Sequence, residues 1–411
     1  MNPKVSRRTF VGAAVAAGAA KMSRAQGGAA KRGAFDVAVI GAGVFGTWTA
    51  QKLQTRGLKV ALIDEYGPAS TRSSSGGETR VIRMGYGPQE IYSKWSWDSL
   101  RQWKTLERTT GERLFTETGM LFLARERDPL TLDSVATLKK LGIPHEVLER
   151  PELQKRYPQI ELGPITWALS EPRSGALFAR RSVQAVAREF EKAGGEFILG
   201  RAELPAESGA ATSIQVGARS VRAAHFVFAC GPWLGKVFKE ILGDRIFPTR
   251  QEVFYFGAPP GDDRFAPPKM PTWIDFGAEI YGIPDLETRG FKVALDQHGP
   301  RFDPDSGQRI VTPESTALVK AFVAERFPAL KDAPIVGSEV CQYENSSNGD
   351  FLIDRHPNRE NVWLVGGGSG HGFKHGPALG AYVADRITKG GETDKKFSLA
   401  TKDKVQARVV H

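Results

Sequence analysis

The sequence predicts an α/β fold in which a βαβ domain, assembled from separated segments of the chain, carries an inserted antiparallel-sheet domain. Three observations support this prediction. A short apolar run at residues 35–40 leads into a glycine-rich turn and a helical pattern. A second apolar run followed by glycines comes much later, at residues 361–370. Between them, residues 250–311 are rich in aromatic residues, proline and glycine, which is typical of short antiparallel strands.

The N-terminal 32 residues have the composition of an export signal. Ser6-Arg7-Arg8-Thr9-Phe10 precedes a weakly apolar stretch over residues 12–20, and a small-residue motif ends at Ala25. These features are typical of a twin-arginine signal peptide. A disordered basic tail is the alternative, but no acidic residue precedes Asp36. The sequence therefore predicts a signal peptide and linker over residues 1–32 and a periplasmic or secreted protein.

Length, charge and cysteine content exclude several classes of protein. A chain of 411 residues is long enough for two domains. The net charge is +10, but five of the basic residues lie within the first 25, so the rest of the chain gives no argument for nucleic-acid binding. No apolar run reaches the roughly 18 residues that a membrane span needs. Two cysteines exclude a disulfide scaffold, and no Cys/His spacing is typical of a metal site, so we expect no metal.

The first βαβ unit carries a dinucleotide fingerprint. A strand over 35–40, a helix over 47–55 and a strand over 59–63 enclose the pattern G-x-G-x-x-G and end at an acidic residue. The glycines permit a tight turn and a close approach of the backbone to a pyrophosphate, which the helix N-terminus attracts. The acidic residue accepts hydrogen bonds from a ribose. The predicted cofactor-binding residues here are Gly41, Gly43, Val44, Phe45, Gly46 and Asp64.

The later segments complete both predicted domains. Helical patterns cover residues 91–107, 182–193 and 377–387, and strand patterns cover residues 197–199, 214–216, 225–231, 252–256, 291–295 and 361–365. The predicted cofactor domain combines residues 33–90, 168–247 and 335–390, the predicted substrate domain combines residues 91–167 and 248–334, and residues 391–411 form a C-terminal tail. The fingerprint alone leaves NAD and FAD open. The remote glycine turn at 366–370 favours FAD, because a flavin ring needs contacts far along the chain.

Five motifs in order connect these segments to a known family. They are the fingerprint with Asp64, G-E-T-R-V-I-R at 77–83, G-F-K at 290–292, V-C-Q-Y at 340–343 and G-H-G-F-K at 370–374. On these motifs, from about Phe35 to Ile387, the chain resembles the FAD-dependent amine oxidases of the monomeric sarcosine oxidase, N-methyltryptophan oxidase and pipecolate oxidase family, within the D-amino-acid oxidase-like superfamily. The resemblance implies an FAD-binding Rossmann-like domain of the glutathione-reductase type with an inserted antiparallel-sheet substrate domain.

The resemblance implies how the flavin is held. Cys341 would form a thioether with the flavin, so that FAD is covalently bound; a buried free cysteine is the alternative. A disulfide between Cys230 and Cys341 would compete with this linkage. Arg80 would lie beside the flavin ring. Further cofactor contacts are implied for Thr79, Gly370, His371, Gly372 and Lys374.

The resemblance also implies a catalytic set. Arg83 and Lys374 would hold a substrate carboxylate, which in a desolvated pocket needs charge-assisted donors. Lys292 would activate oxygen, because a positive charge stabilises developing superoxide. Tyr281 would line the substrate cavity. Ordinary surface salt bridges for the two carboxylate ligands, and a solvent-exposed strand lysine for Lys292, are the alternatives.

Three positions depart from the family pattern. Asp296 stands four residues after Lys292, where the sarcosine oxidase pattern has a histidine, and Ser75 and Gly76 replace a histidine pair. We expect the flavin chemistry to be unaffected. An acidic Asp296 near the cavity would favour a substrate whose side chain is cationic or carries a hydroxyl group.

The predicted reaction is oxidation of the C–N bond of a small secondary amine or N-substituted, sarcosine-like amino acid, with O2 reduced to H2O2. A basic pocket disfavours the ammonium form of the amine, and the neutral amine is the form that is oxidised. The alternative is a periplasmic flavin amine dehydrogenase that passes electrons to a quinone or carrier, although the presence of Lys292 argues against it. A nicotinamide-dependent enzyme and a flavin-binding protein without turnover are further alternatives. The expected partners are the amine and O2, and we expect a monomer.

Overall fold

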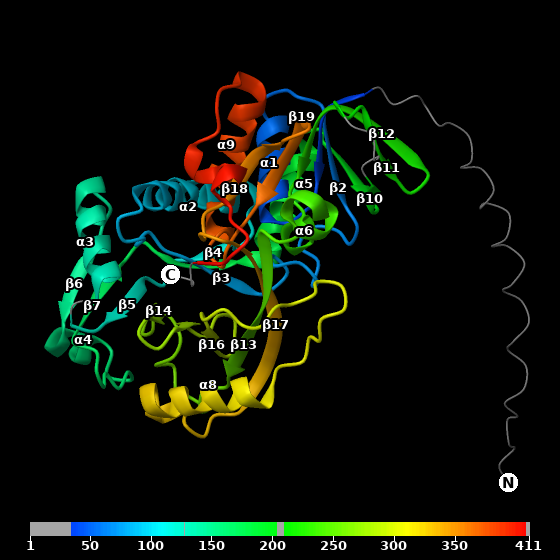
Figure 1. Ribbon diagram of the computed structural model, residues 1–411. Helices are drawn as coiled ribbons and strands as arrows, with labels where there is room; N and C mark the ends of the chain where they lie inside the picture. Colours follow the sequence, from blue (N-terminus) through cyan, green and yellow to red (C-terminus); the bar gives the residue numbers. More distant parts are fainter. Residues whose placement is uncertain (1–33, 127, 204–208, 408–411) are drawn as a thin grey trace, which may run out of the picture. The chain divides into compact units, whose positions relative to one another are not determined.

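The computed structural model describes residues 34–126, 128–203 and 209–407, so the predicted signal peptide over residues 1–32 lies outside the described part. Within that part the strands form two eight-stranded sheets and one three-stranded sheet. Strands that are far apart in sequence lie side by side in both large sheets (Figure 1).

The first sheet is built around the predicted βαβ unit. β1 (Phe35–Ile40) pairs in parallel with β2 (Val60–Asp64) on one side and with β12 (Arg219–Phe228) on the other. The sheet continues in parallel through β9 (Glu196–Leu199), next to β2, and β19 (Arg359–Gly366), next to β12. The antiparallel additions are β10 (Ala202–Glu203), β11 (Ser213–Val216) and β18 (Leu352–His356).

Helices cover both faces of this sheet, and its inner strands are therefore almost continuously apolar. The face that includes Val37 and Val39 packs against α1, α5 and α9, whereas the face that includes Ala38 and Ile40 packs against α6 and α7. These helices are α1 (Val44–Gln54), α5 (Ala179–Lys192), α9 (Gly376–Lys389), α6 (Leu234–Val237) and α7 (Lys239–Leu242). A Cβ on Gly380 would lie 2.7 Å from the backbone of Trp48, so glycine is what lets α9 pack this closely against α1.

The second sheet presents one apolar face to a helix and the other to the site described below. On β13, Phe254 and Phe256 pack with Val319 and Val323 of α8 (Pro313–Arg326), which lies along that face (Figure 1). Because side chains alternate along a strand, Val253 and Tyr255 face the other way. In spatial order the strands are β17 (Ile335–Ser346), β13 (Ile246–Phe256), β16 (Phe291–Leu295), β15 (Ile280–Ile283), β14 (Thr272–Asp275), β5 (Met120–Ala124), β7 (Trp167–Glu171) and β6 (Glu146–Glu149).

The smaller elements connect the two large sheets. The third sheet consists of β3 (Thr79–Ile82), β8 (Gly175–Phe178) and β4 (Phe115–Thr116). The other helices are α2 (Glu90–Thr110), α3 (Pro129–Leu141) and α4 (Arg150–Arg156), and the 3-10 helices are η1 (Gly231–Trp233), η2 (Pro328–Leu330), η3 (Phe373–His375), η4 (Lys395–Phe397) and η5 (Leu399–Thr401).

The predicted strands and helices are confirmed, with ends that differ by a few residues. The division into domains stays a prediction, but two strands bear on its boundaries. The predicted division assigns all of β17 and most of β7 to the cofactor domain. In the structure both strands belong to the second sheet, where β17 pairs with β13 and β7 pairs with β5. The predicted tail over residues 391–411 includes η4 and η5, and its Phe397 is fully buried.

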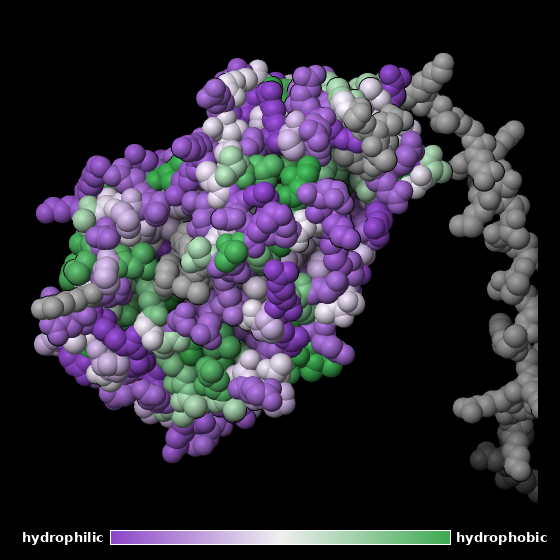
Figure 2. All heavy atoms as spheres, in the orientation of Figure 1, coloured by the Kyte–Doolittle hydropathy of each residue, from purple (hydrophilic) through white to green (hydrophobic). Residues whose placement is uncertain are grey.

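On the face seen in Figure 2, hydrophilic residues surround smaller apolar patches. The exposed large apolar side chains include Leu199, Ile310 and Val405. Among the described helices, none combines the length and apolarity required to cross a bilayer.

Candidate active site

Two cavities with a common wall occupy the region between the first and second sheets. The large cavity has a volume of about 530 Å³ and the small cavity about 70 Å³. The side chains and backbone that line both are Arg80, Cys341, Tyr343, Gly370 and Phe373. A ligand in the large cavity therefore lies next to a ligand in the small one.

The fingerprint glycines form one end of the large cavity. Gly41 has φ +104°, and a Cβ on it would lie 2.2 Å from the carbonyl oxygen of Ala229. A Cβ on Gly46 would lie 1.7 Å from the Gly41 oxygen, so this glycine acts through packing and does not line the cavity. Gly43, Val44 and Phe45 do line it. The turn thus brings bare backbone and the N-terminus of α1 to the cavity, as an anionic ligand requires.

Asp64 lines the same end of the cavity and braces the turn. Its carboxylate accepts backbone hydrogen bonds from Ala42 at 2.7 Å and from Tyr66 and Gly67 at 2.8 Å. Burial raises the pKa of Asp64, and these backbone N–H groups oppose the rise. The side chain is therefore fixed in orientation at the end of β2, where the sequence predicts a ribose contact.

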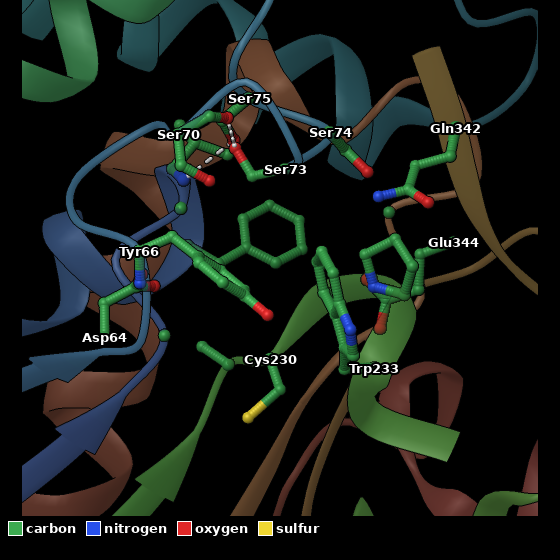
Figure 3. A pocket seen from close by; sticks show the side chains of 18 of the residues that line it. Asp64, Tyr66, Ser70, Ser73, Ser74, Ser75, Cys230, Trp233, Gln342 and Glu344 are labelled. Carbon is green, nitrogen blue, oxygen red and sulfur yellow. Dashed lines mark hydrogen bonds between the residues drawn. The ribbon is translucent and has the colours of Figure 1, made fainter. Parts of the chain in front are cut away.

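Three buried polar atoms in this cavity have no hydrogen-bond partner among the residues that the structure describes. They are Ser74 Oγ, Gln342 Oε1 and Glu344 Oε1, and the three side chains are labelled in Figure 3. Buried polar atoms are almost always paired, so unpaired ones around a large cavity indicate a polar ligand. A second glycine turn contributes more bare backbone: a Cβ on Gly370, which has φ +77°, would lie 2.7 Å from the ring of Tyr343.

These features fit FAD. The helix N-terminus suits its pyrophosphate, and the unpaired polar atoms suit its hydroxyl and ring groups. Gly41, Gly43, Val44, Phe45 and Asp64 would hold one end, and Arg80, Cys341, Gly370 and Gly372 the other. Two predicted cofactor contacts, His371 and Lys374, line only the small cavity, and Thr79 lines neither.

Cys341 lies on β17 where the two cavities meet. An Nη atom of Arg80 donates to Cys341 Sγ over 3.3 Å, and the same guanidinium donates to the carbonyl oxygens of Ser74 at 2.7 Å and Thr79 at 2.8 Å. This hydrogen bond holds the sulfur beside the guanidinium, between the two cavities. Both cysteines are free thiols in the structure. Cys230 also lines the large cavity, but burial raises the pKa of its thiol.

Two cations contribute to the small cavity from opposite ends of the sequence. Arg83 is 6% exposed and its guanidinium lies 4.3 Å from the ring centroid of Tyr86. Lys374 is 4% exposed, and its Nζ donates to the Tyr86 hydroxyl at 2.8 Å and to the His371 carbonyl at 2.9 Å. Burial, together with the charge of Arg83, lowers the pKa of Lys374. An anion bound here would relieve the repulsion between the two cations.

Lys292 lines neither cavity, but it lies close to Arg80 and Cys341, which belong to the wall that both share. It is 2% exposed, and its Nζ donates to the Thr79 carbonyl at 2.9 Å. Burial, and secondarily the charge of Arg80, lowers the pKa of Lys292 to about 7. Lys292, for which the resemblance implies oxygen activation, is therefore buried close to Arg80 and is not a solvent-exposed strand lysine.

Three polar side chains form a hydrogen-bonded row across the small cavity. The Tyr343 hydroxyl bonds with both Tyr281 and Asp296, and all three residues line the cavity. Burial raises the pKa of Asp296 to about 6, against the opposing charges of Arg83 and Lys374. The structure therefore brings the departure at position 296 into the same cavity as Arg83, Lys374 and Tyr281.

Sequence reasoning missed several lining residues. On β17, Glu339 and Tyr343 flank Cys341 at two-residue spacing, and on β13 Gln251 pairs with Cys341 across the sheet. The signal for the first two was available, because residues at i−2 and i+2 of a strand share a face. The pairing with Gln251 depends on the register of β13 and β17, which no local pattern encodes. No group of three or more described His, Cys, Asp or Glu residues is placed to hold a metal ion.

The comparisons agree with the geometry. Residues 36–386 match the family model described as "FAD dependent oxidoreductase". The monomeric sarcosine oxidase of Bacillus sp. (strain B-0618) is 30% identical over 379 residues, which cover 89% of this chain and 95% of that protein. The peroxisomal sarcosine oxidase of Homo sapiens is 28% identical over 368 residues, covering 88% and 94%. The crystal structure of L-proline dehydrogenase from P. horikoshii has the same fold, with a TM-score of 0.77 at 21% identity, and covers 89% of this chain and 97% of its own. The predicted family and fold class are confirmed.

Proposed function

We propose that this chain, which belongs to the family of FAD-dependent oxidoreductases, oxidises the C–N bond of a small secondary amine or N-substituted amino acid and passes the electrons to O2, giving H2O2. The observation that carries the proposal is the small cavity, in which two buried cations lie next to the wall shared with the cofactor cavity. The sarcosine oxidases among the similar proteins support the same substrate class.

The cations of the small cavity would bind the substrate by its carboxylate. Arg83 and Lys374 are both buried, so a carboxylate between them makes charge-assisted hydrogen bonds out of contact with bulk water. This fixes the amine nitrogen and its neighbouring carbon at the shared wall. The cavity of about 70 Å³ limits the substrate to a small molecule.

The same charges bear on the protonation of the amine. FAD, when bound, supplies the two-electron redox chemistry, and an amine donates a hydride equivalent only in its neutral form. Arg80 and Arg83 lower the pKa of a nearby ammonium group. Ionised Asp296 has the opposite effect and raises the pKa of the ammonium group. The fraction of bound substrate in the neutral, reactive form therefore depends on both the cations and Asp296.

A peroxide-release screen tests the proposal. Purified protein is assayed in air against N-methyl, cyclic and glycated amino acids, each beside the matched amine without a carboxylate. We expect peroxide from at least one carboxylate-bearing amine and far less from its partner. Anaerobic assays with a quinone or a dye as acceptor test the dehydrogenase alternative. Turnover with these acceptors, without peroxide formation in air, would replace the oxidase by that alternative.

We also propose that FAD is linked covalently through Cys341. The hydrogen bond from Arg80 to Cys341 Sγ, and the position of this sulfur between the two cavities, support the choice of this cysteine. Cys341→Ser should abolish the in-gel flavin fluorescence of denatured protein. Cys230→Ser is the matched control and should retain it. Equal fluorescence in both variants would reject the linkage.

Export by the twin-arginine route is proposed on the sequence alone. The motif at Arg7 and Arg8 lies outside the described residues, and its test is independent of catalysis. Replacing both arginines by lysine should retain folded, flavin-containing protein in the cytoplasm. Unchanged distribution between cytoplasm and periplasm would exclude this route.

A further inference from the structure

Glu344 is a buried carboxyl group that the proposed chemistry does not use. It lies on β17, lines the large cavity and is 5% exposed. Its Oε1 atom is buried, and no group in the described part of the chain bonds to it. Figure 3 shows it among the lining side chains, on the same side of the cavity as Trp233 and Gln342. An unpaired oxygen of this kind is costly unless a ligand satisfies it.

The protein is shaped to admit this carboxyl group. A Cβ on Gly366 would lie 2.3 Å from Glu344 Oε1, so only glycine at position 366 leaves room for it. Backbone N–H groups of Gly367 and Gly368 donate to the carboxyl group. One part of the group is therefore held by the glycine turn, whereas Oε1 is left for a partner outside the protein.

Its surroundings favour the neutral acid. Burial raises the pKa of Glu344 to about 8, and the opposing contributions are the N–H groups of Gly367 and Gly368. Among the described residues, the titratable group next to Glu344 is the Cys230 thiol, and burial raises the pKa of that thiol as well. The residue of α6 that lies next to Gly366, as Glu344 does, is the apolar Leu234. No basic side chain of the described part neutralises the carboxyl group. Near pH 7 it is therefore an O–H donor as well as an acceptor.

The position of Glu344 indicates which part of FAD it contacts. The N-terminus of α1 suits the pyrophosphate, and Cys341 and Arg80 mark the flavin-ring end. Glu344 follows Cys341 by three residues on the same strand. FAD carries the hydroxyl groups of its ribityl chain between these two ends. We propose that Glu344, as a neutral carboxylic acid, binds a ribityl hydroxyl of FAD.

The test compares two ligands and two variants in full-length apoprotein carrying Cys341→Ser, which limits the measurement to non-covalent binding. Glu344→Gln keeps a neutral donor and acceptor, whereas Glu344→Leu removes both. At pH 7 we expect Glu344→Leu to weaken FAD binding by about 3- to 15-fold and Glu344→Gln to leave it nearly unchanged. ADP, which lacks the ribityl chain, should bind all three proteins equally. Equal loss of ADP binding would overturn the ribityl assignment.

A second experiment measures FAD affinity as a function of pH, and it does not require the Glu344→Leu variant. If FAD binds only the protein in which Glu344 is neutral, its affinity is full below the pKa of Glu344 and falls as the pH rises through that pKa. FAD affinity of the protein with Glu344 should therefore fall about tenfold between pH 7 and 9, and Glu344→Gln should stay nearly constant. The same fall in both proteins would overturn the proposal even if Glu344→Leu did not fold.

Discussion

The two cavities differ in the parts of the chain that line them. The large cavity includes backbone from two glycine turns, at 41–46 and 366–372, in its lining, whereas the small cavity is lined largely by side chains from several strands and one loop. Backbone positions depend on close packing of neighbouring segments, and charged side chains depend on distant segments meeting at the right register. Changes in the first region should therefore remove the cofactor altogether, and changes in the second should alter rates and preferences in a protein that still holds it.

The strongest test of this contrast is Gly46→Ala. Its Cβ would lie 1.7 Å from the backbone oxygen of Gly41, so the turn and α1 cannot both stay in place. We expect a loss of more than about 4 kcal/mol of stability and no FAD-containing protein. Thermal unfolding and the flavin absorbance of purified protein measure both.

Gly57→Ala is the matched control, since it follows the other end of α1 with φ +86° and has no atom within 4 Å of its Cβ position. It should cost only about 1–2 kcal/mol and retain FAD. If Gly46→Ala behaved like this control, the packing account of the fingerprint would be wrong.

The second prediction concerns the buried lysine close to the shared wall. Lys292→Met should slow flavin reoxidation by O2 by about 10²–10³-fold and leave anaerobic reduction by substrate nearly unchanged, because Lys292 lines neither cavity. Its pKa of about 7 adds a signature: reoxidation should slow as the pH rises through 7 in the protein with Lys292, and not in the variant. Stopped-flow measurements of flavin reduction and of flavin reoxidation test this prediction. If the rate of reoxidation by O2 were the same in the variant, Lys292 would not activate oxygen.

The same contrast explains what could be predicted from sequence. The fingerprint turn, β1 and α1 are local: glycine spacing, an apolar run and a helical pattern lie within about 30 residues, and the structure confirms them. The site itself is not local. Arg83 and Lys374 could be paired only through the family resemblance, since nothing near either residue indicates the other.

The differences between prediction and structure have the same origin. Lys292 is predicted from the resemblance to activate oxygen, with a solvent-exposed strand lysine as the alternative, and the fold buries it close to Arg80, because β16 turns it towards the carbonyl of Thr79. Glu344 was passed over, because a glutamate in a strand normally faces solvent. Its burial depends on Gly366, which lies on β19, a strand of the other large sheet.

The third prediction tests the carboxylate site. Arg83→Met should lower kcat/KM for a carboxylate-bearing amine by about 10- to 100-fold, because one buried charge-assisted partner is lost. The matched amine without a carboxylate is the control and should change little. FAD content should stay at the level of the unmodified protein, which separates this effect from that of Gly46→Ala. Equal losses for both amines would mean that Arg83 does not bind the carboxylate.

The smallest expected effect belongs to Asp296, which tunes the cavity that Arg83 and Lys374 define. Above its pKa of about 6 the carboxylate of Asp296 competes with an anionic ligand for the two cations, and below it the neutral acid does not. Binding of acetate, followed by flavin absorbance, should therefore weaken between pH 5 and 7.5. Asp296→Asn should make this change with pH about three- to tenfold smaller. If both proteins gave the same pH dependence, Asp296 would not contribute to the charge of the substrate site.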